Sequence, residues 1–266
     1  MTNSYSFHAG SVPLLVSVPH DGRDLPDDIA SLMTDAGRSL PDTDWHVARL
    51  YEFAKDIGAS MIIARNSRYV VDLNRPTDDS AMYEGQLETG LCPTQTFDGQ
   101  DLYAGSVSID VDDRVKRYWR PYHDRISETL AAFRKSHGYA LLWDAHSIAS
   151  RVPRLFDGEL PVLNIGTWKG KSCAQSLSAA VVQVAQDSAY DAVINGRFTG
   201  GYTTRNYGDP EKNVHAIQLE LAQRAYMDEA TTNYRQAKAS QLSDTLSRLL
   251  EAFTKTAGDN AAIMSR

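Results

Sequence analysis

Short apolar runs alternate with longer amphipathic segments along most of this 266-residue chain. The short runs have the length of buried β-strands, whereas the longer ones repeat apolar residues at helical spacing. This alternation restricts the chain to an α/β fold, in which helices cover both faces of a mixed, largely parallel sheet. We therefore predict a single three-layer α/β/α domain over residues 1–266. The predicted strands are residues 13–19, 59–64, 68–73, 139–146, 161–167, 191–195 and 214–221.

The amphipathic segments predict four helical regions. One begins near Asp42, which is a good N-cap residue, and ends at Gly58. A second carries apolar residues on one side from Val115 to Phe133, and Pro121 predicts a kink there or a division into two helices. The remaining helices are predicted at about residues 171–186 and 231–255.

Residues 76–107 form a long segment without clear periodicity, rich in Asp, Gly, Thr and Gln. Loops of this length are uncommon inside compact domains, and those that occur are usually functional. We therefore predict that this segment is functional or forms a lid.

Composition and motifs exclude several classes of function. The net charge of −7 argues against a nucleic-acid partner, because such proteins usually carry a basic excess. The absence of GxSxG, GxxxxGK[ST] and GxGxxG motifs argues against a serine hydrolase and a nucleotide-binding protein. The chain has neither a signal-peptide pattern nor an apolar stretch long enough to cross a bilayer, so we predict a cytoplasmic protein without a membrane partner. Cys92 and Cys173 offer no CxxC spacing and are expected to be free thiols.

Four of the predicted strands end in polar residues, at the edge where α/β sheets bind their ligands. These residues are His20, Asn74 with Arg75, Asp144 with His146, and Glu220. Because side chains alternate along a strand, Asp144 and His146 share one face. Gln218 and Glu220 likewise share one face of the last strand. A carboxylate inside a run as apolar as VHAIQLEL is costly unless it is paired or binds a ligand.

Histidines and carboxylates at converging strand ends are the side chains that bind zinc. Each also has an ordinary structural explanation when it is taken alone. His20 could be a hydrogen-bonded turn residue, and Glu220 could pair with an arginine. Asp144 could orient the ring of His146. Four further histidines lie in the N-terminal tail, on helical faces or at a strand start and are not expected to be ligands: His8, His123, His137 and His215.

Six segments together resemble the N-formylglutamate amidohydrolase family. In chain order they are SVPHDGRDLP, LPDTDWHVARLY, SRYVVDLNRP, WDAHSI, NGRFTGGYTTRNYG and HAIQLELAQRAYM. The resemblance extends from about residue 10 to about residue 255, and VVDLNRP and GGYTTRNYG are its most distinctive parts. The family is distantly similar in layout to zinc carboxypeptidases. The resemblance therefore implies their hydrolase-like sheet and a cofactor of zinc or another divalent first-row metal.

The same resemblance implies a set of metal ligands. His20 and His146 match the two histidines, and one carboxylate completes the set. The related enzymes take that carboxylate from an HxxE arrangement, which this chain lacks after His20. We predict Asp44, in the DTDWH segment, as the third ligand. Asp21 and His46 remain alternatives.

The residues that the resemblance assigns to the substrate include a base and several carboxylate-binding groups. Glu220 would activate water and return its proton to the leaving amine. Asn74 and Arg75 would hold a substrate carboxylate, because a guanidinium binds a carboxylate in two places. Arg205 is a second candidate and Arg68 a third, although Arg68 could instead polarise the carbonyl. Three neighbours of Arg205 are expected to line the same pocket: Thr203, Asn206 and Tyr207.

The activity that the resemblance implies is the hydrolysis of a small-molecule acyl amino acid. The expected reaction converts N-formyl-L-glutamate into L-glutamate and formate, a step of histidine degradation. One alternative is an amidohydrolase of the same design that removes a succinyl, acetyl or carbamoyl group. Another is a noncatalytic protein that binds carboxylates through its arginines.

Overall fold

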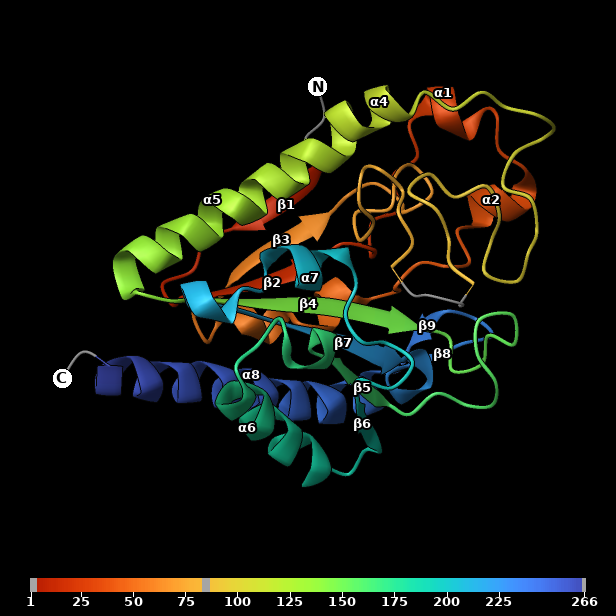
Figure 1. Ribbon diagram of the computed structural model, residues 1–266. Helices are drawn as coiled ribbons and strands as arrows, with labels where there is room; N and C mark the ends of the chain where they lie inside the picture. The colour runs from red at the N-terminus through yellow and green to blue at the C-terminus, as the bar shows by residue number, and fades with distance from the viewer. Residues whose placement is uncertain (1–3, 83–86, 265–266) are drawn as a thin grey trace.

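The computed structural model describes residues 4–82 and 87–264, which form a central mixed sheet with helices on both faces (Figure 1). This confirms the predicted α/β fold. The seven strands lie in the order β1-β3-β2-β4-β7-β5-β6. Strands β3, β2, β4 and β7 are parallel to one another, whereas β1 and β5 run antiparallel to their neighbours β3 and β7. Their bounds are β1 Tyr5–His8, β2 Leu14–Val18, β3 Ser60–Ala64, β4 Ala140–Ile148, β5 Leu163–Gly166, β6 Ala192–Ile194 and β7 Val214–Ala222. A separate pair consists of β8 Met227–Asp228 and β9 Asn233–Tyr234.

The helices are α1 Asp27–Ala30, α2 Asp35–Ser39, α3 Val47–Leu50, α4 Val111–Arg114, α5 Arg120–His137, α6 Gln175–Gln186, α7 Tyr202–Tyr207 and α8 Gln236–Met264. α6 and α8 lie on one face of the sheet, and α5 lies on the other (Figure 1). Leu141 and Trp143 of β4 pack in the apolar cluster with α6 and α8, whereas Leu142 packs with α5. Alternation therefore places Asp144 and His146 on the α5 side of the sheet. Within the described residues, no helix has the length and apolarity needed to cross a membrane.

Residues 68–73 form a series of turns, so the predicted strand there was wrong. The backbone groups of this segment form hydrogen bonds outside the sheet. The N–H of Asp72 donates to the carbonyl of Leu91 at 2.7 Å. The carbonyl of Val70 accepts from the side chain of Arg114 at 3.0 Å. The apolar side chains are nevertheless buried in the cluster with α5. Burial alone produced the apolar pattern, and the pattern could not distinguish a buried loop from a strand.

The helix predicted over 42–58 is much shorter in the structure. It consists of α3 (Val47–Leu50), followed by a short 3-10 turn. Asp42 does not cap it. Its carboxylate instead accepts hydrogen bonds from the hydroxyl of Tyr69 at 2.6 Å and the backbone N–H of Phe97 at 2.7 Å. An apolar helical face was thus predicted correctly in part, but the capping residue was not.

Pro121 lies in the first turn of α5, directly after a π-helical turn, η2, at Val115–Trp119. This turn joins α5 to α4, so the disturbance predicted at the proline takes the form of a widened turn before it. Such π-helical turns are frequent at functional sites. The described parts of 76–107 contain isolated bridges but no helix or strand. That this segment acts as a lid stays a prediction.

Candidate active site

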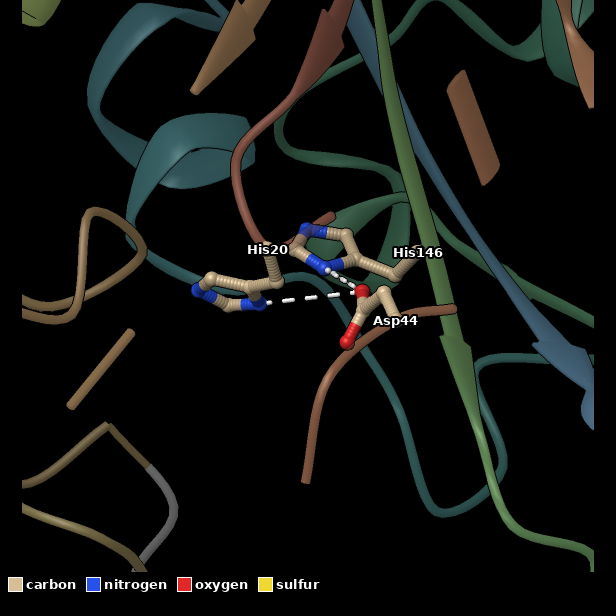
Figure 2. Close-up of side chains that lie close together, drawn as sticks. All are labelled: His20, Asp44 and His146. Atoms are coloured by element: carbon tan, nitrogen blue, oxygen red, sulfur yellow. Dashed lines mark hydrogen bonds and ion pairs between the residues drawn. The ribbon is translucent and has the colours of Figure 1, made fainter. Parts of the chain in front are cut away.

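Three predicted ligands lie together beyond the carboxyl ends of the parallel strands. His20 follows β2, His146 lies on β4, and Asp44 lies in the turn before α3. Oδ2 of Asp44 is 3.1 Å from Nδ1 of His146 and 3.7 Å from Nδ1 of His20 (Figure 2). All three side chains are buried, and one ligand atom from each lies within 4.8 Å of the others. In the part of the chain that the structure describes, this is the one group of three such side chains.

The far nitrogen of each ring faces a different carboxylate. Nε2 of His20 lies 2.8 Å from Oδ1 of Asp72, and Nε2 of His146 lies 3.1 Å from Oδ2 of Asp144. Both Nδ1 atoms are thereby turned toward Asp44. Nδ1 of His20 is buried and has no hydrogen-bond partner. A buried polar atom without a partner is costly, so this nitrogen is well suited to bind a metal ion. Carboxylates that contact the far nitrogen of each ring are typical of metal-binding histidines.

The site is rich in buried carboxyl groups. Four buried carboxylates surround it, from Asp44, Asp72, Asp144 and Glu220. Arg68 is buried with them, with its guanidinium 2.6 Å from Asp72 and 3.8 Å from Asp44. Burial opposes the ionisation of Asp72, but Arg68 and His20 hold its pKa well below the usual range. Burial likewise opposes the ionisation of Asp44, but the two histidines lower its pKa. The ionised carboxylates of Asp44 and Asp72 favour a cation beside them.

Glu220 is a direct neighbour of His146 because β7 pairs in parallel with β4 and the register aligns the two residues. The amide of Gln218 donates to Oε2 of Glu220 at 3.1 Å. Oε1 of Gln218 accepts from the backbone N–H of Gly201 at 2.6 Å. Burial raises the pKa of Glu220 to about 8. A nearby cation would lower this pKa again, because it favours the carboxylate form.

A cavity of about 70 Å³ opens beside these groups. Six predicted residues line it: His20, Arg68, Asn74, Arg75, His146 and Glu220. Arg197, Phe97 and Gln218 also line it, although the sequence did not predict them as site residues. The guanidinium of Arg75 donates to the carbonyl of Thr89 at 2.7 Å, and that of Arg197 donates to the carbonyl of Leu155 at 3.1 Å. Two guanidinium groups besides Arg68 therefore border the cavity.

Besides Asp44, four predicted residues do not line this cavity: Thr203, Arg205, Asn206 and Tyr207. Thr203 acts through its backbone, because its N–H donates to Oδ1 of Asn74 at 2.8 Å. The guanidinium of Arg205 donates to the carbonyl of Gly200 at 2.7 Å. The hydroxyl of Tyr207 lies 2.9 Å from Nδ1 of His123, and Asn206 is exposed. These residues therefore surround the site rather than face the cavity.

Comparison with known proteins shows the family to which the chain belongs. The model of the N-formylglutamate amidohydrolase family matches residues 12–227. The chain belongs to this family. Two curated relatives named N-formylglutamate deformylase, from Pseudomonas putida and Pseudomonas aeruginosa, are each 48% identical to it over 95% of this chain and 96% of their own length. The resemblance predicted from the six segments is thus confirmed.

Solved structures show the same fold. The crystal structure of N-formylglutamate amidohydrolase from Ralstonia eutropha JMP134 has a TM-score of 0.82 and 22% identity, covering 95% of this chain and 98% of that one. A gene product of Agrobacterium tumefaciens has a TM-score of 0.70 and 19% identity, with 94% and 96% covered.

In this member of the amidohydrolase family, the two alternative ligands have other partners. The carboxylate of Asp21 accepts from the backbone N–H groups of His46 at 3.0 Å and Ala48 at 3.1 Å, at the start of α3. Burial raises the pKa of Asp21 to about 6. Nε2 of His46 lies 2.7 Å from the carbonyl of Thr232. Asp21 thus binds the first turn of a helix, a position that favours a carboxylate.

Two residues of this site were not predicted from the sequence. Asp72 faces His20, Arg68 and the backbone N–H of Asn74. Its place two residues before Asn74 in VVDLNRP was the available signal, but that segment was interpreted as a strand. Arg197 lies in the loop segment NGRFTGG, which has no periodicity, so nothing in the sequence distinguished it from a surface arginine.

Proposed function

We propose that this chain hydrolyses N-formyl-L-glutamate to L-glutamate and formate. The observation that carries the proposal is the convergence of His20, Asp44 and His146 next to Glu220, beside a cavity that His20, His146 and Glu220 line. This set combines metal-binding side chains with a buried carboxylate, the composition of metal-assisted hydrolysis. The curated relatives that are 48% identical carry the name N-formylglutamate deformylase, which supports the choice of substrate.

The metal would be Zn²⁺ or another divalent first-row ion, held by Nδ1 of His20, Nδ1 of His146 and a carboxylate oxygen of Asp44. The donor set fits, because two imidazole nitrogens and one carboxylate with an open position are typical of catalytic zinc. The unpartnered Nδ1 of His20 is consistent with it. When bound, such an ion acts as a Lewis acid that activates water and polarises a carbonyl oxygen.

Glu220 would act as the general base and then as the general acid. Its carboxylate takes a proton from the attacking water and returns it to the nitrogen of glutamate as the formamide bond breaks. An amine anion is a poor leaving group, so this return of the proton is required. The amide of Gln218, 3.1 Å from Oε2, holds the carboxylate in place.

The substrate carries two carboxylates, and two guanidinium groups besides that of Arg68 line the cavity. Arg75 would bind one carboxylate, as expected from the sequence, and Arg197 would bind the other. Arg205 is the weaker candidate because it does not line the cavity. Arg68 lies 3.8 Å from Asp44, beside the proposed metal ligands, so it would polarise the reacting carbonyl rather than bind a carboxylate of the substrate.

The size of the cavity bears on the acyl group. Formyl is the smallest acyl group, so a tight pocket around the reacting carbonyl would select it over acetyl or succinyl. The second candidate function, hydrolysis of a larger acyl amino acid, would need more room around that carbonyl. A noncatalytic carboxylate-binding protein would make no use of Glu220 or of the histidine pair.

Formate release from N-formyl-L-glutamate tests the proposal, measured beside the N-acetyl and N-succinyl analogues. We expect turnover of the formyl substrate, its loss with a chelator and much slower release from the analogues. Faster turnover of an analogue would favour the second candidate. Normal binding of acyl-glutamate without any turnover, by metal-free and metal-loaded protein alike, would indicate a carboxylate-binding protein.

A further inference from the structure

The dipeptide Asn74-Arg75 lies in a loop, so no strand fixes its backbone. Its two ends are held from the helical run that contains Pro121. Nε2 of His123 lies 2.8 Å from the carbonyl oxygen of Leu73, just before the dipeptide. Nε1–H of Trp119 donates to the carbonyl of Arg75 at 3.0 Å. Two ring donors therefore bracket the pair of residues.

The two donors form one unit on the helical run. Trp119 is the last residue of the π-helical turn, and His123 follows it by four positions, which places both rings on the same side. The rings stack with centroids 3.8 Å apart and planes inclined by 28°. Tyr202 packs against both rings. The stacking fixes the direction of both donors toward the loop.

The environment of His123 selects the form that can donate. Its side chain is buried, and burial lowers its pKa to about 4. The ring is thus neutral near pH 7, with a hydrogen on one nitrogen. Because the carbonyl of Leu73 needs a donor, the hydrogen lies on Nε2, and Nδ1 carries no hydrogen and lies 2.9 Å from the hydroxyl of Tyr207.

From the dipeptide, contacts continue to the site. The side-chain amide of Asn74 lies 3.0 Å from Nε2 of His146, and its Oδ1 accepts from the backbone N–H of Thr203 at 2.8 Å. The side chain of Arg75 lines the cavity. A shift of this backbone would therefore move a neighbour of a proposed ligand and a proposed substrate contact together.

We propose that Trp119 and His123 are positioning residues for the hydrolysis proposed above, holding the backbone of Asn74-Arg75 so that Arg75 meets the substrate carboxylate. The expected effect on KM rests on the proposed function, whereas the role in holding the backbone rests on the hydrogen bonds of the two rings alone. A purely structural aromatic cluster would need the rings but not their N–H groups.

Three variants separate the donors from the rings. Trp119→Phe keeps an aromatic ring and removes its N–H, and His123→Phe does the same at the second position. His123→Gln returns an amide donor near the position of Nε2. The matched control is Arg125→Met on the same helix, which loses its contacts with Tyr5 and Phe7, far from the dipeptide.

We expect Trp119→Phe to raise KM for N-formyl-L-glutamate about 3- to 10-fold, the range of one hydrogen bond, with a smaller change in kcat. His123→Phe should act in the same direction, and His123→Gln should recover most of the loss. In an Arg75→Met background, Trp119→Phe should add little, because the contact through which it acts is gone. Equal KM for Trp119→Phe and Arg125→Met, or fully multiplicative effects with Arg75→Met, would overturn the proposal.

Amide hydrogen exchange over residues 70–78 provides a readout that needs no substrate. Exchange there should accelerate in Trp119→Phe and His123→Phe and stay at the wild-type rate in Arg125→Met. If the wild type releases no formate while this pattern holds, the proposed function fails and the backbone role stands. If formate is released normally and exchange is unchanged in both ring variants, the positioning role fails and the proposed function stands.

Discussion

Two histidines of this protein are equally buried and differ in almost everything else. His146 is 2% exposed and His123 is 3% exposed. Burial alone would lower the pKa of both, because it disfavours the charged ring. It does so at His123, whose neighbours are aromatic rings and a carbonyl, and its pKa falls to about 4. At His146 the carboxylates of Asp144 and Asp44 outweigh burial and raise the pKa well above its usual range.

The difference shows that the neighbouring charges decide what a buried ring can do. The carboxylates around His146 favour a positive charge at that place, which a proton or a metal ion can supply. The aromatic surroundings of His123 keep it neutral, so it can serve as a directed hydrogen-bond donor. One histidine belongs to the proposed chemistry, and the other to the framework that holds it.

The largest effect is expected at the base beside His146. Glu220→Gln should lower kcat about 10²- to 10⁴-fold, because the amide cannot take the proton of water. The metal content should remain that of the wild type, since Glu220 is not a proposed ligand. Steady-state formate release and elemental analysis on the same sample check this. A rate near that of the wild type would remove Glu220 from the mechanism.

The second prediction concerns acid and His123. Its folded pKa of about 4 lies below its ordinary value of 6.5, so the unfolded chain binds more protons. Its contribution to stability is therefore complete above pH 6.5 and is lost as the pH falls toward 4. The loss amounts to about 3 kcal/mol, at 1.36 kcal/mol for each pKa unit.

Denaturant unfolding of the wild type and of His123→Gln between pH 7.5 and 4 measures this contribution of His123 to stability. The contributions of other titrating groups cancel when the free energies of unfolding of the two proteins are subtracted. The free energy of unfolding of the wild type should fall more steeply than that of the variant. Parallel curves for the two proteins would mean that His123 is not held neutral by its surroundings.

A smaller effect, on metal affinity, is expected from substituting the groups that contact the rings of His146 and His123. Asp144→Asn removes the carboxylate at Nε2 of His146 and should weaken metal binding about 10- to 100-fold. Tyr207→Phe removes the hydroxyl at Nδ1 of His123 and should leave metal affinity unchanged. Competition with a chromogenic chelator gives both affinities. Equal effects of the two substitutions would erase the distinction between the two histidines.

The smallest effect is expected at the alternative ligand. His46 contacts the carbonyl of Thr232, away from the group formed by His20, Asp44 and His146. His46→Gln should therefore leave metal content unchanged and lower the free energy of unfolding by about 1 kcal/mol, the value of one hydrogen bond. Loss of metal in this variant would move the third ligand from Asp44 to His46.

Polar residues that directly follow apolar runs allowed much of the site to be predicted from the sequence. His20, His146 and Glu220 stand at or near the ends of real strands, and the sheet brings such ends to one edge. The α/β architecture followed from the same alternation. Asp44 came from the family resemblance, because no local pattern distinguishes it from its neighbours.

Other parts of the site and its surroundings could not be predicted from the sequence. The loop that carries Asp72 is as apolar as a strand, since its side chains are buried without one. Arg197 reaches the cavity from a loop whose course depends on long-range contacts. His123 lies on a helical face, and the sequence alone could not show that this face meets the carbonyl of Leu73.

The central claim is that His20, Asp44 and His146 bind one metal ion that the reaction requires. Chelator-treated protein should be titrated with Zn²⁺ while formate release is measured, for the wild type and for Asp44→Asn. The account predicts that the wild-type rate rises with added zinc and levels off at about one equivalent per chain, with little recovery in Asp44→Asn. Full activity of the metal-free wild type, or equal recovery in both proteins, would contradict it.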